Sequence, residues 1–171
     1  MDRRIKVLLT GGCGFVGGNI VEQAQTRPDL ELFALDNRII PSTFSNVTWH
    51  ALDLRDQGQL SELFARLAPD VVIHTAAMSD IDFCEKNRKL AQEVNIGVTE
   101  ALVELAGRRG SRFIWYSFIE LVHAEGCNFR VHFSASIFLF MANIVSQLAL
   151  NVNSFWLVLY NNQKNILEAI G

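Results

Sequence analysis

The sequence feature that most constrains the fold is a glycine-rich turn near the N-terminus. An apolar run at residues 5–9 leads into TGGCGFVG at residues 10–17, and a segment with helical character begins near Asn19. A strand, a tight glycine turn and a helix start, in this order, are the context in which such glycine spacing indicates dinucleotide binding. The first 25 residues therefore predict a nucleotide-binding βα unit.

Each glycine of this turn has a physical role in such a unit. Gly11 permits a sharp turn, Gly14 lets the backbone approach a pyrophosphate, and Gly17 allows the helix to pack closely on the strand. The N–H groups at the start of the helix then face the phosphates. A second apolar run ends in Asp36, which is placed to accept hydrogen bonds from an adenosine ribose. The alternative is a glycine loop that serves only as a turn, with Asp36 solvated at a strand end.

The rest of the N-terminal two thirds alternates between strand and helix patterns. A continuous apolar run at 71–74 is typical of a parallel strand buried on both faces. Apolar residues at i, i+3, i+4 and i+7 predict a helix over 60–67, and a longer stripe predicts one over 90–108. Further strands are predicted at 31–36, 47–51 and 112–117. This alternation predicts an α/β fold with a doubly wound parallel sheet of the Rossmann type.

Composition excludes several classes of protein. Half of the 171 residues are hydrophobic and 19% are charged, which is typical of a globular domain. The net charge of −3 gives no electrostatic reason to expect nucleic acid as a partner. Cys13, Cys84 and Cys127 lack metal-ligand spacing, so no metal site is predicted, and their odd number suits a reducing compartment. With no signal-peptide core at the N-terminus, a cytoplasmic location is predicted. His74 is interpreted as a core histidine.

The chain changes character after residue 130. No Lys, Arg, Asp or Glu lies between Arg130 and Lys164. We therefore predict a nucleotide-binding domain at 1–130 and a divergent segment at 131–171. This segment could pack against the open edge of the sheet, anchor to a membrane, or come from a frameshifted gene end. The membrane anchor is the least favoured, because residues such as Asn143 and Gln147 are costly in lipid.

Several motifs together resemble one family. They are TGGCGFVG at 10–17, Asp36, ALDLRD at 51–56, VVIHTAA at 71–77 and Asn95. The pattern is similar to the extended short-chain dehydrogenase/reductase family, which contains sugar-nucleotide epimerases, dehydratases and reductases. Residues 78–95 look most like the dTDP-4-dehydrorhamnose reductase branch. The resemblance covers residues 5–117 and implies NAD as cofactor and a nucleotide-sugar as substrate.

The resemblance also implies a role for individual residues. The backbone at Phe15 and Val16 would contact the pyrophosphate. Asp36 would select NAD, although a neighbouring Arg38 could offer a counter-charge to the 2′-phosphate of NADP. Asp53 would accept from the adenine amine. The cofactor residues that the resemblance implies are Gly11, Gly14, Phe15, Val16, Gly17, Asp36, Asn37, Arg38, Asp53, Leu54, Ala76, Ala77 and Asn95. Taken singly, most of these have an ordinary structural interpretation: a turn aspartate, core alanines, a helix-surface asparagine.

The resemblance implies hydride transfer at a hydroxyl or ketone carbon, with a tyrosine whose pKa is lowered by a nearby lysine. The matching positions are Ser117, which would orient the substrate, and Tyr160 with Lys164 four residues later. Phe118 and Ile119 replace the residues usual after this serine, and an uncharged stretch separates Ser117 from Tyr160. On this resemblance, we expect most of the family's C-terminal substrate lobe to be lacking. The alternative is a non-catalytic or truncated NAD(P)-binding remnant that turns nothing over.

Overall fold

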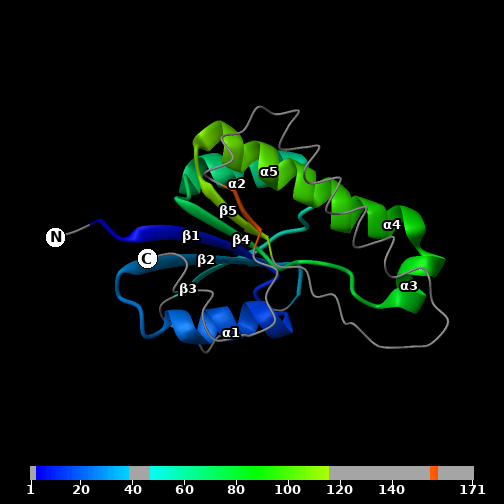
Figure 1. Cartoon of the computed structure of the whole chain (residues 1–171), viewed down its shortest axis with the longest axis horizontal. Helices are drawn as coiled ribbons and strands as arrows, with labels where there is room; N and C mark the ends of the chain where they lie inside the picture. Colours follow the sequence, from blue (N-terminus) through cyan, green and yellow to red (C-terminus); the bar gives the residue numbers. More distant parts are fainter. Residues whose placement is uncertain (1–2, 39–46, 116–154, 158–171) are drawn as a thin grey trace.

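The structure is a computed structural model of the chain, and it describes residues 3–38, 47–115 and 155–157. Strands and helices alternate along it (Figure 1). The strands are β1 (Ile5–Thr10), β2 (Leu30–Asp36), β3 (Val47–Ala51), β4 (Val71–His74), β5 (Arg112–Trp115) and β6 (Phe155–Leu157). The helices are α1 (Phe15–Ala24), α2 (Gln57–Leu67), α3 (Ile81–Lys86), α4 (Arg88–Gln92), a π-helical turn η1 (Glu93–Gly97) and α5 (Val98–Arg109).

The strands form one sheet in the order β3-β2-β1-β4-β5-β6, and all of the pairs are parallel. The chain builds outward from β1 to β3 and then crosses back to β4, so the order reverses between β1 and β4. In open α/β sheets ligands bind at this reversal, outside the carboxyl ends of the strands. The predicted Rossmann-type fold is confirmed, and the order of its strands reverses beside Thr10 and His74, where ligands of such sheets bind.

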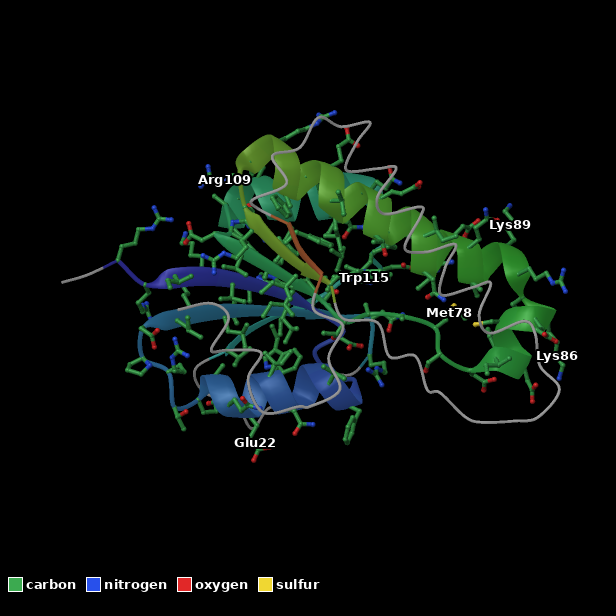
Figure 2. All side chains as sticks on the ribbon, viewed as in Figure 1. Glu22, Met78, Lys86, Lys89, Arg109 and Trp115 are labelled. Atoms are coloured by element: carbon green, nitrogen blue, oxygen red, sulfur yellow. The ribbon has the colours of Figure 1, made fainter. Side chains whose placement is uncertain are left out.

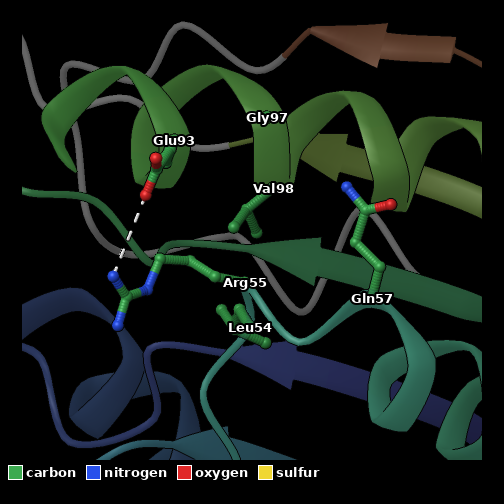
Figure 3. Close-up of a pocket in the computed structure, with 6 residues that line it drawn as sticks. All are labelled: Leu54, Arg55, Gln57, Glu93, Gly97 and Val98. Carbon is green, nitrogen blue, oxygen red and sulfur yellow. Dashed lines mark ion pairs between the residues drawn. The ribbon is translucent and has the colours of Figure 1, made fainter. Parts of the chain in front are cut away.

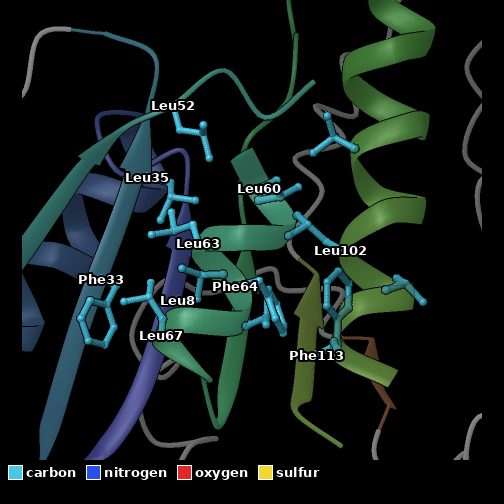
Figure 4. Packing of buried hydrophobic residues seen from close by; sticks show 14 of the residues in the cluster. Leu8, Phe33, Leu35, Leu52, Leu60, Leu63, Phe64, Leu67, Leu102 and Phe113 are labelled. Carbon is cyan, nitrogen blue, oxygen red and sulfur yellow. The ribbon is translucent and has the colours of Figure 1, made fainter. Parts of the chain in front are cut away.

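The two faces of the sheet carry separate hydrophobic cores. Val7 and Leu9 of β1 pack with Ile20 and Val21 on the face covered by α1. Leu8, between them in the sequence, faces the other way and joins a core with residues of α2 and α5. Figure 1 shows α1 on one side of the sheet and α2 with α5 on the other, and Figure 4 shows the second core from close by. Successive strand residues point to opposite faces, which is why the buried strands read as continuous apolar runs.

The region from residue 81 to residue 109 differs from the single helix predicted over 90–108. Helical structure begins earlier, at α3, where the Asp80 carboxylate accepts from the Phe83 N–H at 2.9 Å and caps the helix. The π-helical turn η1 then separates α4 from α5. The apolar stripe marks where a helix packs on a core. The predicted helix therefore covers most of α4 and all of η1 and α5, but the stripe could not reveal α3, which has no buried residue, or the change to a π-helical turn at η1.

Residues 155–157 form β6, which lies parallel to β5 as the sixth strand of the sheet. They belong to the divergent segment 131–171, whose other residues lie outside the described part of the chain. Among the helices that the structure describes, none has the length and apolar character needed to cross a membrane.

Candidate dinucleotide-binding site

The glycine turn is a tightly closed loop between β1 and α1. The N–H groups of Gly11 and Gly12 both donate to the Leu35 carbonyl, at 2.9 and 3.2 Å, which ties the turn to β2. Gly11 has a φ of +75°, a conformation that favours glycine. A Cβ on Gly17 would lie 2.1 Å from the Gly11 carbonyl oxygen. Both residues therefore have to be glycine for steric reasons.

The start of α1 presents backbone N–H donors, but no side chain of its N-cap or first turn accepts from them. Gly14 is the N-cap and offers no side chain, and the first turn of the helix holds no acidic residue. Within the described residues, the N–H groups of Phe15 and Val16 donate to no backbone carbonyl. The positive end of the helix dipole adds to these donors. This end of α1 is therefore suited to an anion such as a phosphate.

The space in front of Gly14 is open on one side. Its ψ is 169° and its φ is −74°, which any residue can adopt. A Cβ there would lie 3.1 Å from the Gly11 carbonyl oxygen, and the next nearest atom is Nη2 of Arg38 at 3.9 Å. Gly14 is therefore not required by backbone strain; the absent Cβ leaves room for a group outside the turn.

Asp36 ends β2 with a buried carboxylate that faces the glycine turn. Its side chain is 4% exposed. Oδ2 accepts from the Cys13 N–H at 2.9 Å, and Oδ1 accepts from the Arg38 N–H at 3.0 Å. The Arg38 guanidinium adds hydrogen bonds at 3.0 and 3.2 Å. Burial alone would raise the pKa of Asp36, but the hydrogen bonds from Arg38 and Cys13 outweigh it and hold the pKa below its usual value.

Asp53 follows β3 and lies at the same end of the sheet. The Leu52 N–H, one residue earlier, donates to the Asp36 carbonyl at 3.0 Å, which joins the ends of the two strands. Arg55 binds Asp53 through its N–H and its Nε, both at 3.0 Å from Oδ1. These hydrogen bonds lower the pKa of Asp53. In contrast to Asp36, this carboxylate is 44% exposed, so water also solvates it.

A hollow of about 170 Å³ lies beside Leu54 (Figure 3). Arg55 and Glu93 flank it and form a loose ion pair, with Nη1 and Oε2 3.9 Å apart. Sites for drug-sized ligands usually measure about 300–1,000 Å³. The hollow could therefore hold a fragment the size of a ring system. Its lining residues are Leu54, Arg55, Gln57, Glu93, Gly97 and Val98.

A buried hydrogen-bonded chain runs behind the glycine turn, from β1 through His74 to α5. His74 Nδ1 is 2.6 Å from the Thr10 hydroxyl oxygen, and Nε2 is 3.0 Å from that of Thr99. Because the Thr99 hydroxyl donates to the Asn95 carbonyl at 2.9 Å, Nε2 of His74 must carry the proton and Nδ1 must accept one from Thr10. Burial lowers the pKa of His74 to about 4. The interpretation as a core histidine is confirmed.

Asn95 holds the segment that follows β4. Its Oδ1 accepts from the Met78 N–H at 2.7 Å, and its Nδ2 donates to the Met78 carbonyl at 3.0 Å. Figure 2 shows Met78 on the extended segment between β4 and α3. The turn lies against the start of this segment, since a Cβ on Gly11 would lie 2.8 Å from the Ala76 nitrogen. Ala76 is half-buried and Ala77 is exposed.

Sequence reasoning missed three residues that support this site. Thr10 and Thr99 are buried polar residues that bind His74, and a threonine inside an apolar strand or stripe was the available signal. The third residue is Trp49. Its indole lies directly beneath the turn, since a Cβ on Gly12 would lie 2.8 Å from the ring. This contact could not have been read from the sequence, because it joins strands that are not adjacent along the chain.

The structure places the predicted cofactor residues at one end of the sheet, around and beyond the carboxyl ends of its strands. Asn37 and Arg38 are exposed there. The predicted catalytic residues Ser117, Tyr160 and Lys164 lie outside the described residues. In the described part of the chain, no group of three or more His, Cys, Asp or Glu side chains could hold a metal ion.

Comparison with known proteins identifies relatives of this chain. The family model described as "RmlD substrate binding domain" matches residues 5–119. CDP-paratose 2-epimerase of Salmonella typhi is 27% identical over 71% of the chain, and human 3 beta-hydroxysteroid dehydrogenase type 7 is 34% identical over 67%. The UDP-glucose 4-epimerase of Thermus thermophilus, solved as a complex with NAD, superposes on 85% of the chain with a TM-score of 0.67 and 25% identity.

These matches cover only part of each relative. The chain spans 38% of the epimerase from Salmonella and 32% of the human dehydrogenase. It spans 52% of the Thermus structure. The matches confirm the resemblance to the extended short-chain dehydrogenase/reductase family that the motifs indicate.

Proposed function

This chain belongs to the RmlD substrate binding domain family, and we propose that it binds NAD at the carboxyl end of its sheet. The diphosphate lies against the start of α1, and Asp36 accepts hydrogen bonds from the adenosine ribose. This proposal rests on the N–H donors at the start of α1, which lie close to the buried carboxylate of Asp36. The N–H groups of Phe15 and Val16 donate to no backbone carbonyl among the described residues, and beside them lies a carboxylate that is 4% exposed.

The residues around the turn fit the parts of this cofactor. The open space at Gly14 is where a phosphate would approach the backbone, and a Cβ would fill it. The ionised Asp36 favours ribose hydroxyls over a 2′-phosphate, which supports NAD as the cofactor. Leu54 and the hollow beside it offer an apolar surface close to the adenine end. A complex of the Thermus relative with NAD supports the same assignment.

We further propose that the reaction of the whole protein is hydride transfer on a nucleotide-sugar. The nicotinamide supplies the hydride acceptor or donor when it is bound. Thr10 and Asn95 hold the segment from Ala76 to Met78 in place beside the turn. Ser117, Tyr160 and Lys164 remain the predicted catalytic residues. The similarity to CDP-paratose 2-epimerase supports a nucleotide-sugar, whereas the human relative is named for a steroid.

Binding and turnover can be tested separately. NADH is titrated into the purified chain, and both tryptophan emission and NADH emission are recorded. Trp49 lies beneath the glycine turn and reports on it. The proposal predicts saturable quenching of the tryptophan emission. A folded chain that shows no saturation with NADH would refute the binding site.

Turnover is then assayed with UDP-glucose, a dTDP-4-dehydro sugar and a 3β-hydroxysteroid. Absorbance of the nicotinamide detects net oxidation or reduction, and chromatography of the products detects epimerisation, which returns the hydride and leaves the absorbance unchanged. Turnover of a nucleotide-sugar that is lost in Tyr160→Phe would support the catalytic assignment. Saturable NADH binding without turnover of any member of this panel would favour a cofactor-binding protein that is not itself an enzyme.

A further inference from the structure

The connecting segment, residues 75–78, follows β4 and lies beyond the end of the sheet ladder. β4 pairs with β1 and β5 as far as His74, so no described strand pairs with these four residues. The segment still lies against the glycine turn, because a Cβ on Gly11 would lie 2.8 Å from the Ala76 nitrogen and 3.0 Å from the Thr75 hydroxyl oxygen. A shift of this segment would therefore disturb the turn.

Two residues hold the two ends of the connecting segment. At the first end, the Thr10 carbonyl accepts from the Thr75 hydroxyl at 2.7 Å, and the Thr10 hydroxyl oxygen accepts from the Ala76 N–H at 3.4 Å. At the other end, the Asn95 amide binds both backbone groups of Met78, at 2.7 and 3.0 Å. Thr10 belongs to β1 and Asn95 to η1. The separation of these two elements therefore sets how the segment lies.

Behind the segment, His74 joins Thr10 to the backbone that carries Asn95. The Thr10 hydroxyl donates to Nδ1 of the imidazole at 2.6 Å, and Nε2 donates to the Thr99 hydroxyl at 3.0 Å. That hydroxyl donates in turn to the Asn95 carbonyl at 2.9 Å. All of these hydrogen bonds run in one direction, which requires a neutral ring with its proton on Nε2. Burial lowers the pKa of His74 to about 4, so the ring is neutral at neutral pH.

Resting on the NAD-binding function above, we propose that His74 is a positioning residue for the cofactor site, which sets the separation of Thr10 from Asn95 and so fixes the connecting segment against the glycine turn. The imidazole is rigid and presents one donor and one acceptor at a fixed spacing. Apolar groups of the same shape can replace a buried hydrogen-bonded pair at little cost in stability. Packing alone therefore does not explain a continuous chain of hydrogen bonds between the two residues that hold the segment.

The test breaks the chain at Thr99, which is buried and lies on the opposite side of the His74 ring from Thr10. Thr99→Val keeps the shape of the side chain and removes the hydroxyl, whereas Thr99→Ser keeps the hydroxyl and loses a methyl group. NADH affinity is measured by quenching of tryptophan emission. We expect Thr99→Val to bind NADH about fivefold more weakly and Thr99→Ser to bind within about twofold of the unmodified chain.

Amide hydrogen exchange without cofactor gives an independent readout. In Thr99→Val, we expect the N–H groups of Ala76 and Met78 to exchange about tenfold faster relative to that of Leu8, which lies inside β1 and reports on global stability. A threonine that only supports the core would leave these two ratios and the NADH affinity unchanged.

The ring nitrogens of His74 give a third readout, which needs no variant and so tests the proposal even where a variant does not fold. Their ¹⁵N chemical shifts in the unmodified chain should show the proton on Nε2. A ring protonated on Nδ1 would overturn the proposal.

Thr26→Val is the matched control, because it makes the same exchange of a hydroxyl for a methyl group. The Thr26 hydroxyl donates to the Gln23 carbonyl at 2.9 Å, at the end of α1 that is remote from the glycine turn. We expect this variant to leave the NADH affinity and the exchange of Ala76 and Met78 unchanged.

The possible results separate the two proposals. Unchanged NADH affinity in Thr99→Val, or equally weak binding by Thr99→Val and Thr99→Ser, would overturn the positioning role and leave NAD binding intact. Failure of the unmodified chain to bind NADH would overturn the proposed function. Exchange then decides the positioning role by itself: faster exchange of Ala76 and Met78 in Thr99→Val supports it, and unchanged exchange overturns it.

Discussion

Both ends of the sheet carry exposed ion pairs, such as Asp53 with Arg55 at the carboxyl end, but the ends differ in that the carboxyl end also holds buried polar side chains. At the amino end, Arg3 pairs with Asp70, and the Asp70 carboxylate also accepts from the Lys6 N–H at 2.9 Å. Arg27 pairs with Asp29 close by. These pairs lie at the surface, where water also solvates the partners. At the carboxyl end, by contrast, Asp36 and His74 are 5% and 1% exposed.

The polar groups at the two ends therefore differ in how much they depend on partners within the protein. Exposed ion pairs such as those at the amino end contribute little to stability, about 0–1 kcal/mol each. The buried groups at the carboxyl end lose their hydration and depend on fixed partners, such as Thr10 and Thr99 for His74. Such a concentration of buried polar groups beside unmatched helix donors is typical of a binding site.

The largest effect is expected from Gly17→Ala, at the carboxyl end. The new Cβ would lie 2.1 Å from the Gly11 carbonyl oxygen, so α1 would have to move away from the turn. We expect the free energy of unfolding to fall by about 3 kcal/mol or more, measured by urea denaturation. Gly18→Ala is the matched control in the same helix, because its Cβ would lie 3.8 Å from the nearest atom. Equal stability of the two variants would show that the turn is looser than the structure has it.

The second effect is a dependence of stability on pH that comes from His74. Its pKa is about 4 in the folded chain, below the ordinary value of 6.5, so the unfolded chain binds more protons between these two values. Stability is therefore fully present above pH 6.5 and falls as the pH drops toward 4, by at most about 1.4 kcal/mol per pH unit. The measurement is urea denaturation at several pH values across this range.

His74→Gln should flatten most of this slope. Burial also lowers the pKa of His50, so that residue adds a smaller slope of the same sign. Hydrogen bonds outweigh burial at Asp36 and Asp70 and hold the pKa of each carboxyl below its ordinary value. An unchanged slope in His74→Gln would contradict the buried neutral histidine.

The smallest effect is expected from Asp70→Asn, at the amino end. The pair with Arg3 is lost, but the side chain of Asp70 is 32% exposed and water can solvate what remains. We expect a loss of stability of about 1 kcal/mol or less, and no change in NADH affinity. A large change in NADH affinity would contradict the conclusion that only the carboxyl end of the sheet binds the cofactor.

The sequence predicted the parts of this molecule that depend on local pattern. The strands predicted at 47–51 and 71–74 coincide with β3 and β4, and the second of them is a continuous apolar run that is buried throughout. Asp36 was placed at the end of β2 by its spacing from the glycine turn. The π-helical turn, in contrast, accompanies the contact of Asn95 with Met78, which lies 17 residues away. The partners of His74 and the contact of Trp49 with the turn also join distant segments, and no local pattern records them.

Arg38 also shows that a sequence pattern does not specify the partner of a side chain. Sequence alone suggested that Arg38 could face a 2′-phosphate. The structure shows that the guanidinium binds Asp36 itself, through Nε and Nη2. Whether a neighbouring cation binds a carboxylate or a ligand depends on side-chain geometry that spacing does not specify.

The most direct test of the account is a titration of NADH into Gly14→Ala, with Gly18→Ala and the unmodified chain beside it. Gly14 has a backbone conformation that alanine can adopt, but a Cβ there would lie 3.1 Å from the Gly11 carbonyl oxygen, which has to shift slightly. We expect the variant to fold with a lowered thermal midpoint, which is measured beside the affinity. We predict that its affinity for NADH falls by at least about tenfold, since the new Cβ occupies the place of the diphosphate. Gly18→Ala should bind like the unmodified chain. Unchanged NADH affinity in a folded Gly14→Ala variant would contradict the account.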